Sequence, residues 1–143
     1  MKKSILLGIL TATGFGLALN PLSVKADELA PEELVVVDSQ SATMGGGMQR
    51  ASINCYANLS KSGLTFVATS TTDRAMDSIW TKCNSYTSGR QLINSNQNTV
   101  YGSSYGSAQA AIGAIHVNAR SRGYHTYKKS GYNTVELITS YNW

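Results

Sequence analysis

Short runs of alternating apolar and polar residues, separated by turn-forming residues, dominate the chain from Arg50 onward. In the run "INCYANL", Ile53, Cys55 and Leu59 fall on one face of an extended segment, and Tyr56 and the asparagines fall on the other. A period of two residues is typical of strands with one buried face. No helical spacing of apolar residues persists beyond a few turns, so the pattern predicts an all-β domain.

The order of these runs predicts about seven strands. The runs "LTFVATS", "SIWTKCNSY" and "YNTVELITSY" are separated by the turn signals "KSG", "TSGR" and "KKSG". The polar stretch "TTDRAMD" is interpreted as a loop, and "AIHVNARSRG" as part of a long strand. Short connections of this kind join antiparallel neighbours, so residues 50–143 are expected to form an antiparallel immunoglobulin-like β-sandwich.

The N-terminus has the layout of a secretory signal peptide. Lys2 and Lys3 precede an apolar run at residues 5–19, and Ala26 stands directly before an expected cleavage point. The run is shorter than the roughly 20 residues that a membrane-spanning helix needs. We therefore expect residues 1–26 to be removed after Ala26 and the remaining chain to be secreted.

Charge is unevenly distributed along the expected mature chain. Residues 27–49 hold five acidic residues, no Lys or Arg, and a glycine triplet at 45–47. This composition predicts a flexible acidic linker, although an arm lying on a basic face is an alternative. Residues 50–143 hold nine basic and three acidic residues, a net charge of +6. A basic domain in an exported chain favours anionic partners.

The two cysteines, Cys55 and Cys83, both fall on the apolar faces of predicted strands. An even number of cysteines in an exported chain of this size favours a disulfide. The bridge would close a loop of about 28 residues and stabilise the domain by about 3–4 kcal/mol. We therefore predict a bond between Cys55 and Cys83.

No motif for catalysis or metal binding is evident. His116 and His125 are the only histidines. His116 lies on the polar face of its strand and His125 in an expected turn, so both are interpreted as surface residues. The two cysteines and two histidines include no close pair of the kind that structural zinc uses. We predict no enzyme activity, no cofactor and no metal, while an enzyme with an unrecognised site stays an alternative.

A group of basic and polar residues, interleaved with tyrosines, forms the candidate binding surface. Such surfaces suit anionic polymers, because cations contact the charges while aromatic rings pack on the backbone. Alternation places Trp80, Lys82 and Tyr86 opposite Cys83 on their strand. The other candidates lie in the second half of the chain: His116, Asn118, Arg120, Arg122, Lys128 and Lys129.

Three segments carry a loose resemblance to a known family: "SINCYANLSKSGLTFVATSTTD", "SIWTKCNSYTSGRQL" and "AIHVNARSRGYHTYKKSGYNTVELITS". Together they resemble small secreted proteins of Gram-positive bacteria (Firmicutes) that consist of a signal peptide and one immunoglobulin-like sandwich. In this chain "GAIHVNA" replaces a Gly-Tyr-Arg-Val-like core, and Glu136 occupies the glutamate position of the final strand. The resemblance implies export and the sandwich fold over about residues 50–143, and it implies no active site.

Two functional hypotheses follow. The first is a non-enzymatic secreted binding module at the bacterial cell envelope, whose partner is an anionic cell-wall polymer, a membrane surface or an envelope protein. Nucleic acid is the least favoured partner, because the chain has an export signal and no nucleic-acid motif. The second is a bacteriocin-like antimicrobial or toxin-like protein, which the small basic domain and the aromatic ending "SYNW" would suit.

Overall fold

The computed structural model describes residues 33–47, 50–112 and 118–142. Within these ranges the chain forms six strands and no helix: β1 (Val35–Met44), β2 (Ile53–Ser62), β3 (Thr65–Tyr86), β4 (Leu92–Ala111), β5 (Arg120–Lys128) and β6 (Val135–Asn142). Every paired neighbour is antiparallel. The prediction of an all-β antiparallel domain is therefore confirmed.

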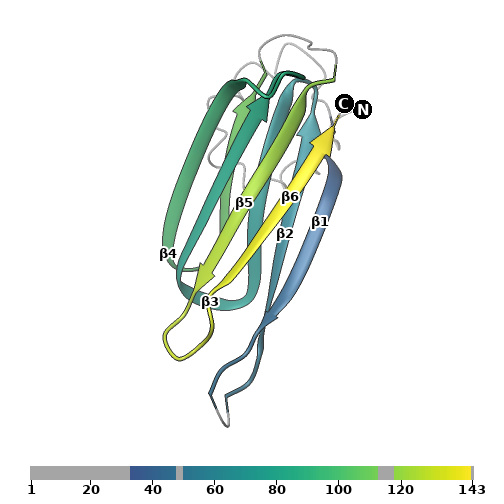
Figure 1. The fold of residues 1–143 in the computed structure, drawn as a ribbon. Helices are drawn as coiled ribbons and strands as arrows, with labels where there is room; N and C mark the ends of the chain where they lie inside the picture. Colours follow the sequence, from purple (N-terminus) through teal and green to yellow (C-terminus); the bar gives the residue numbers. More distant parts are fainter. Residues whose placement is uncertain (1–32, 48–49, 113–117, 143) are drawn as a thin grey trace, which may run out of the picture. The chain divides into compact units, whose positions relative to one another are not determined.

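The sheet has the order β1-β2-β3-β5-β6, with β4 also paired to β3 (Figure 1). β3 is 22 residues long. One of its edges pairs with β4 along both halves of the strand. The other edge pairs first with β2, over Thr65–Thr72, and then with β5, over Ser78–Tyr86. β3 therefore belongs to both halves of the sheet and connects them.

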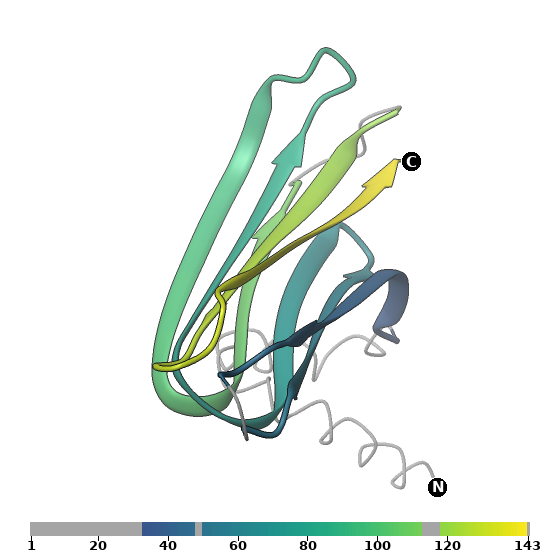
Figure 2. The same ribbon diagram turned by 60° about the horizontal axis from the view of Figure 1, so that its bottom comes forward.

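The two long strands bend where β3 changes partner. The pairing of β3 with β4 shifts register between Thr71 and Met76, and Figure 2 shows both strands curving together. Here the Asp73 carboxylate accepts hydrogen bonds from the backbone N and the Nδ2 of Asn54, at 3.2 and 3.0 Å. The prediction of a loop over "TTDRAMD" is wrong, because β3 continues through this polar segment.

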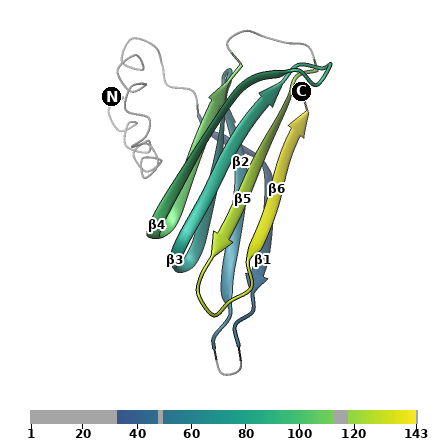
Figure 3. The same ribbon diagram turned by 60° about the vertical axis from the view of Figure 1, so that its left-hand side comes forward.

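The curved sheet closes toward a barrel-like form, with β6 lying beside β1 (Figure 3). The Ser140 backbone N donates to Asp38 Oδ2 at 2.7 Å across this junction. About seven strands in a sandwich of two sheets were predicted. The described residues instead form one continuous sheet of six strands.

β1 corrects the prediction of a linker over residues 27–49. Residues 35–44 are an edge strand that pairs with β2 from Val35↔Lys61 to Met44↔Ile53. Met44 is fully buried and Val37 packs against the core. The prediction of a flexible linker is therefore wrong for β1. The predicted signal peptide, residues 1–26, lies outside the described residues.

Two apolar clusters separated by polar side chains make up the core. One contains Leu59 and Phe66, and the other contains Ile53, Met76 and Tyr127. Along the inward face of β3, Ile79 belongs to the second cluster and Cys83 to the first, with Thr81 between them. Thr81 belongs to a group of buried polar residues that are hydrogen-bonded to one another: Ser70, Thr81, His125 and Thr139.

Candidate functional site

The outer side of β3, β5 and β6 carries most of the residues predicted to bind a ligand. On β3, Ile79, Thr81 and Cys83 are fully buried. The alternating residues Trp80 and Lys82 therefore point away from the core, as predicted. We use the term basic face for the outward residues of β3 and β5 on this side: Trp80, Lys82, Tyr86, Arg120, Arg122, Tyr124 and Lys128.

The register of β3 and β5 brings aromatic and basic side chains together. Lys82 pairs with Tyr124, and Tyr86 pairs with Arg120. Directly paired residues on antiparallel strands project on the same side with their Cβ atoms about 5 Å apart. Each of these two pairs therefore sets one cation beside one aromatic ring.

A chain of hydrogen bonds orders the aromatic residues at one end of the basic face. Ser95 Oγ donates to Asn84 Oδ1 at 2.7 Å, and Asn84 Nδ2 donates to the Tyr86 hydroxyl at 2.7 Å. The Tyr86 and Tyr124 hydroxyls lie 3.4 Å apart. Partial burial is the main cause that raises the pKa of Tyr86, so the phenol stays neutral at physiological pH and acts as a hydrogen-bonding group.

A pocket of about 320 Å³ opens at this same end. Its lining includes three guanidinium groups, together with hydroxyl and amide groups: Tyr86, Arg90, Arg120, Ser121, Arg122, Ser140 and Asn142. Arg90 comes from the turn between β3 and β4, where it adopts a left-handed backbone conformation with φ of 70°. The turn is held by hydrogen bonds from Arg90 N to Thr87 O and from Thr87 N to Gln91 O, each 2.9 Å long.

The positive charge of this pocket has no counter-charge among the described residues that line it. The single ion pair between described residues is Lys129 Nζ to Asp77 Oδ1, at 3.9 Å. Glu136 projects on the side of the basic face opposite Thr126, nearer to Lys128 than to the pocket. Asp38 lies just outside this lining, where its carboxylate accepts a hydrogen bond from the Ser140 backbone N, so the three arginines leave the pocket region with a net positive charge.

The remaining predicted binding residues lie elsewhere. Lys129 is held by Asp77 and by a 3.0 Å hydrogen bond to the Ala75 carbonyl, so it does not join the basic face. Asn118 is exposed in the turn before β5, with φ of 60°, a conformation that Asn tolerates better than most residues. His116 lies outside the described residues.

Sequence reasoning missed Arg90 as a member of this site, and it counted Tyr124 among the interleaved tyrosines without placing it beside Lys82. Arg90 follows the turn signal "TSG" directly after the strand that carries Tyr86, and this proximity was the available signal. Tyr124 becomes a neighbour of Lys82 only through the pairing of β3 with β5. Ser140 and Asn142, from β6, likewise reach the pocket through pairing with β5.

The predicted disulfide is wrong: Cys55 and Cys83 are both free and fully buried. Their inward direction agrees with the prediction, but Cys55 packs in one apolar cluster and Cys83 in the other. Burial is the main cause that raises the pKa of each thiol to about 11. Both cysteines are therefore neutral core residues, far from the thiolate state that nucleophilic chemistry requires.

His125 also differs from the prediction. It lies on β5 rather than in a turn, and only 1% of its surface is exposed. Burial lowers its pKa to about 4, so its imidazole is neutral at physiological pH. Among the described residues, no group of three or more His, Cys, Asp or Glu side chains is placed to hold a metal ion. In the same residues, no helix has the length and apolar character needed to cross a membrane.

Comparison with protein-family models, with curated proteins and with solved structures gives no match. Function is therefore inferred from the chemistry of the residues on the outer surface of the sheet.

Proposed function

We propose that the chain is an exported, non-enzymatic protein whose basic face binds an anionic polymer of the bacterial cell envelope. The observation that carries this proposal is the arginine pocket, in which Arg90, Arg120 and Arg122 line one cavity without a carboxylate among its described lining residues. Guanidinium groups donate paired hydrogen bonds to phosphate and carboxylate oxygens. Three such groups in one pocket favour a ligand with at least one strong anion.

The rest of the basic face extends this proposal from a single anion to a polymer. Arg120 and Arg122 are two residues apart on β5, so their Cα atoms are separated by about 7 Å along the strand. Lys82 and Trp80 continue the surface along β3. A linear polyanion lying along the strands would meet a series of cations, with aromatic rings against its uncharged linkers.

Binding to polyanions of defined chemistry tests the proposal. We suggest measuring affinity for a polyol-phosphate wall polymer, for phosphatidylglycerol vesicles and for polyglutamate at several salt concentrations. The proposal expects tightest binding to the wall polymer, and affinity should fall as salt screens the exposed charges. Equal or stronger binding to vesicles would identify a membrane surface as the partner. Absence of salt-sensitive binding to all three probes would contradict the proposal.

A matched pair of single variants locates the binding surface. Arg122 and Arg74 are both exposed, but Arg122 lies in the pocket and Arg74 at the bend of β3. Arg122→Gln is expected to weaken binding about fivefold to tenfold, the loss of one exposed charge-assisted hydrogen bond. Arg74→Gln removes the same charge and is expected to change affinity less than about twofold. Equal effects of the two variants would show that net charge, and not this face, governs binding.

The export part of the proposal rests on the signal-peptide pattern. Expression of the full chain in a Gram-positive host, followed by N-terminal sequencing of protein from the culture supernatant, tests it. A mature chain beginning at Asp27 supports export with cleavage after Ala26. Full-length protein retained in the cells would contradict it, whatever the outcome of the binding measurements.

We also propose kinship with the small secreted immunoglobulin-like proteins of Gram-positive bacteria. The antiparallel all-β architecture and the inward faces of β2 and β3 are compatible with this relationship. An immunoglobulin-like domain has two separate sheets packed face to face, whereas the described residues form one continuous sheet, so the kinship rests on the strand patterns. Alignment of these strand patterns with sequences of that group tests the kinship, and absence of any significant alignment would contradict it.

A further inference from the structure

A second, uncharged groove lies on the outer side of β1, β2 and the first half of β3. It has a volume of about 410 Å³ and is lined by Ser39, Gln40, Ser41, Tyr56, Asn58 and Thr71. The register of the sheet explains five of these residues, because Ser39 pairs with Asn58, and Tyr56 pairs with both Ser41 and Thr71. Gln40 is the exception, since it pairs with the inward, fully buried Ala57. This side is opposite the core from the basic face, so the groove is a separate feature of the molecule.

Tyr56 provides an aromatic surface in this groove. Its neighbours Cys55 and Ala57 are fully buried, whereas 44% of the Tyr56 surface is exposed. The backbone carbonyl of Tyr56 accepts a 2.7 Å hydrogen bond from the hydroxyl of Tyr127, which is fully buried in the core. The backbone that carries the ring is therefore fixed by a hydrogen bond from the core. Little conformational entropy of this strand is lost when a ligand packs on the ring.

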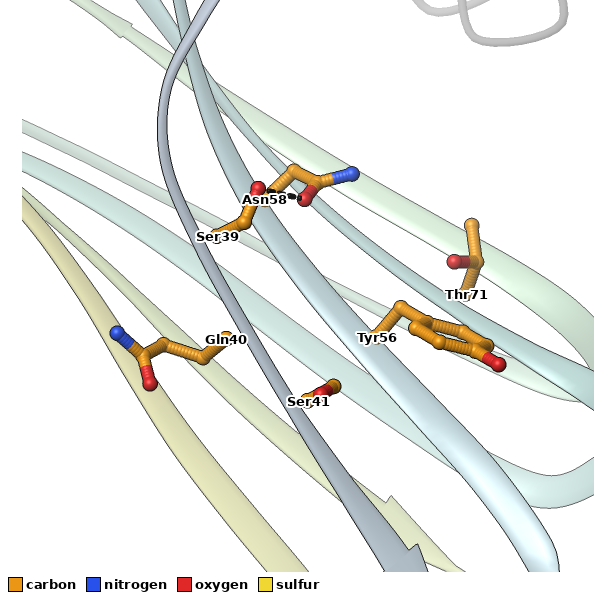
Figure 4. A pocket seen from close by; sticks show the side chains of 6 residues that line it. All are labelled: Ser39, Gln40, Ser41, Tyr56, Asn58 and Thr71. Atoms are coloured by element: carbon orange, nitrogen blue, oxygen red, sulfur yellow. Dashed lines mark hydrogen bonds between the residues drawn. The ribbon is translucent and has the colours of Figure 1, made fainter.

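Asn58 provides oriented hydrogen-bond donors. Ser39 Oγ donates to Asn58 Oδ1 at 2.7 Å, which fixes the direction of the amide. Figure 4 shows the Asn58 nitrogen turned away from Ser39, on the same side of the strands as the Tyr56 ring. No described residue accepts a hydrogen bond from this nitrogen, so its two N–H groups are available to a ligand. The Ser41 and Thr71 hydroxyls border the same space.

The chemistry of the lining defines the ligand. No Lys, Arg, Asp, Glu or His is among the residues that line the groove, so a charged ligand would lose hydration without gaining a counter-charge. A pyranose sugar has an apolar C–H face and a rim of hydroxyl groups. This combination matches an exposed aromatic ring surrounded by amide and hydroxyl groups. The volume is within the range of about 300–1,000 Å³ that is usual for small-molecule sites.

We propose that this groove binds a pyranose ring of a neutral saccharide. The C–H face of the sugar packs on the Tyr56 ring, and its hydroxyls accept from Asn58 Nδ2 and exchange hydrogen bonds with the Ser41 and Thr71 hydroxyls. The inference uses none of the residues of the basic face, so it stands or fails independently of polyanion binding.

Nuclear magnetic resonance titration of the labelled protein tests this inference. The probes are the β-1,4-linked trimers of glucose and of N-acetylglucosamine. With at least one trimer we expect saturable shifts of backbone amides in β1, β2 and the first half of β3, centred on Tyr56 and Asn58. Absence of a saturable shift with both trimers up to about 10 mM, a range that covers typical weak binding, would overturn the inference.

Four substitutions make the test specific. Tyr56→Ala is expected to weaken binding at least about tenfold, whereas Tyr56→Phe keeps the ring and retains most of the affinity. Tyr101 is the control, since it is 76% exposed on β4 and away from the groove, and Tyr101→Ala is expected to leave affinity unchanged. Asn58→Ala is a second probe of the groove, and it is also expected to weaken binding. Unchanged affinity in both Tyr56→Ala and Asn58→Ala would overturn the inference.

Discussion

The Nδ1 atom of His125 lies 2.9 Å from Oγ of Ser70, a residue 55 positions earlier in the chain. Ser70 Oγ is also 2.7 Å from Thr81 Oγ1, and His125 Nε2 is 3.1 Å from Thr139 Oγ1. Four buried polar side chains from β3, β5 and β6 thus satisfy one another inside the core. A satisfied network of this kind fixes the relative position of its strands, because an unpaired member would bear a large desolvation penalty.

The His125 network makes stability depend on pH. Burial lowers the pKa of His125 from 6.5 to about 4, so the unfolded chain binds its proton more readily than the folded chain. His125 therefore leaves the free energy of unfolding unchanged above about pH 6.5. As the pH is lowered, its protonation in the unfolded chain reduces the free energy of unfolding, by about 3 kcal/mol at pH 4. Urea unfolding at pH 7, 6, 5 and 4 measures this loss.

Two variants separate His125 from other titrating groups. His125→Asn is expected to unfold more easily at pH 7 but to lose most of the decline in stability between pH 6.5 and 4. His116→Gln removes the only other histidine and is expected to keep the decline. An identical pH dependence in the wild type and in His125→Asn would contradict this assignment.

Gly123 makes room for the same network. A Cβ atom at this position would lie 2.5 Å from Thr139 Oγ1 and 2.8 Å from His125 Nε2. Gly123→Ala is therefore expected to lower the free energy of unfolding by about 1–3 kcal/mol, the usual penalty of overpacking a core. Gly89→Ala is the control, since its nearest contact would be an ordinary 3.8 Å to Thr87 Oγ1. Chemical denaturation of the two variants gives the comparison, and equal stabilities would refute the steric argument.

Alternation along single strands was predictable from sequence, because the side-chain period of a strand depends only on local geometry. It correctly placed Ile53 and Cys55 inward, and Trp80 and Lys82 outward. It failed for His125, since the inward positions of β5 include Ser121 and Gly123, which carry no apolar signal. Hydrophobic periodicity cannot reveal a core layer that is itself polar.

Which residues of different strands become neighbours was not predictable, because this depends on the pairing register between segments distant in the sequence. Cys55 and Cys83 both face inward, yet they pack in different clusters. The candidate site shows the same limit. The outward direction of Lys82 followed from its own strand, whereas its contact with Tyr124 depends on how β3 pairs with β5.

The free cysteines are directly testable by thiol labelling. Because Cys55 and Cys83 are fully buried with pKa values raised to about 11, the folded protein is expected to react only slowly at pH 8. After denaturation without reductant, two thiols per chain should be labelled, as mass spectrometry would show. Zero labelled thiols under that condition would indicate a disulfide and contradict the structure.

Substitutions of Arg90 distinguish the effect of the arginine pocket on ligand affinity from its effect on stability. Its left-handed backbone, with φ of 70°, is unfavourable for a residue with a side chain. In Arg90→Gly, relief of this strain is offset by the greater freedom of the unfolded chain, so the free energy of unfolding should change by less than about 1 kcal/mol. Affinity for the polyol-phosphate polymer should nevertheless fall about fivefold, because one guanidinium of the pocket is lost. Arg90→Lys keeps the charge and is expected to retain more affinity than Arg90→Gly. Wild-type affinity in Arg90→Gly would exclude Arg90 from the binding surface.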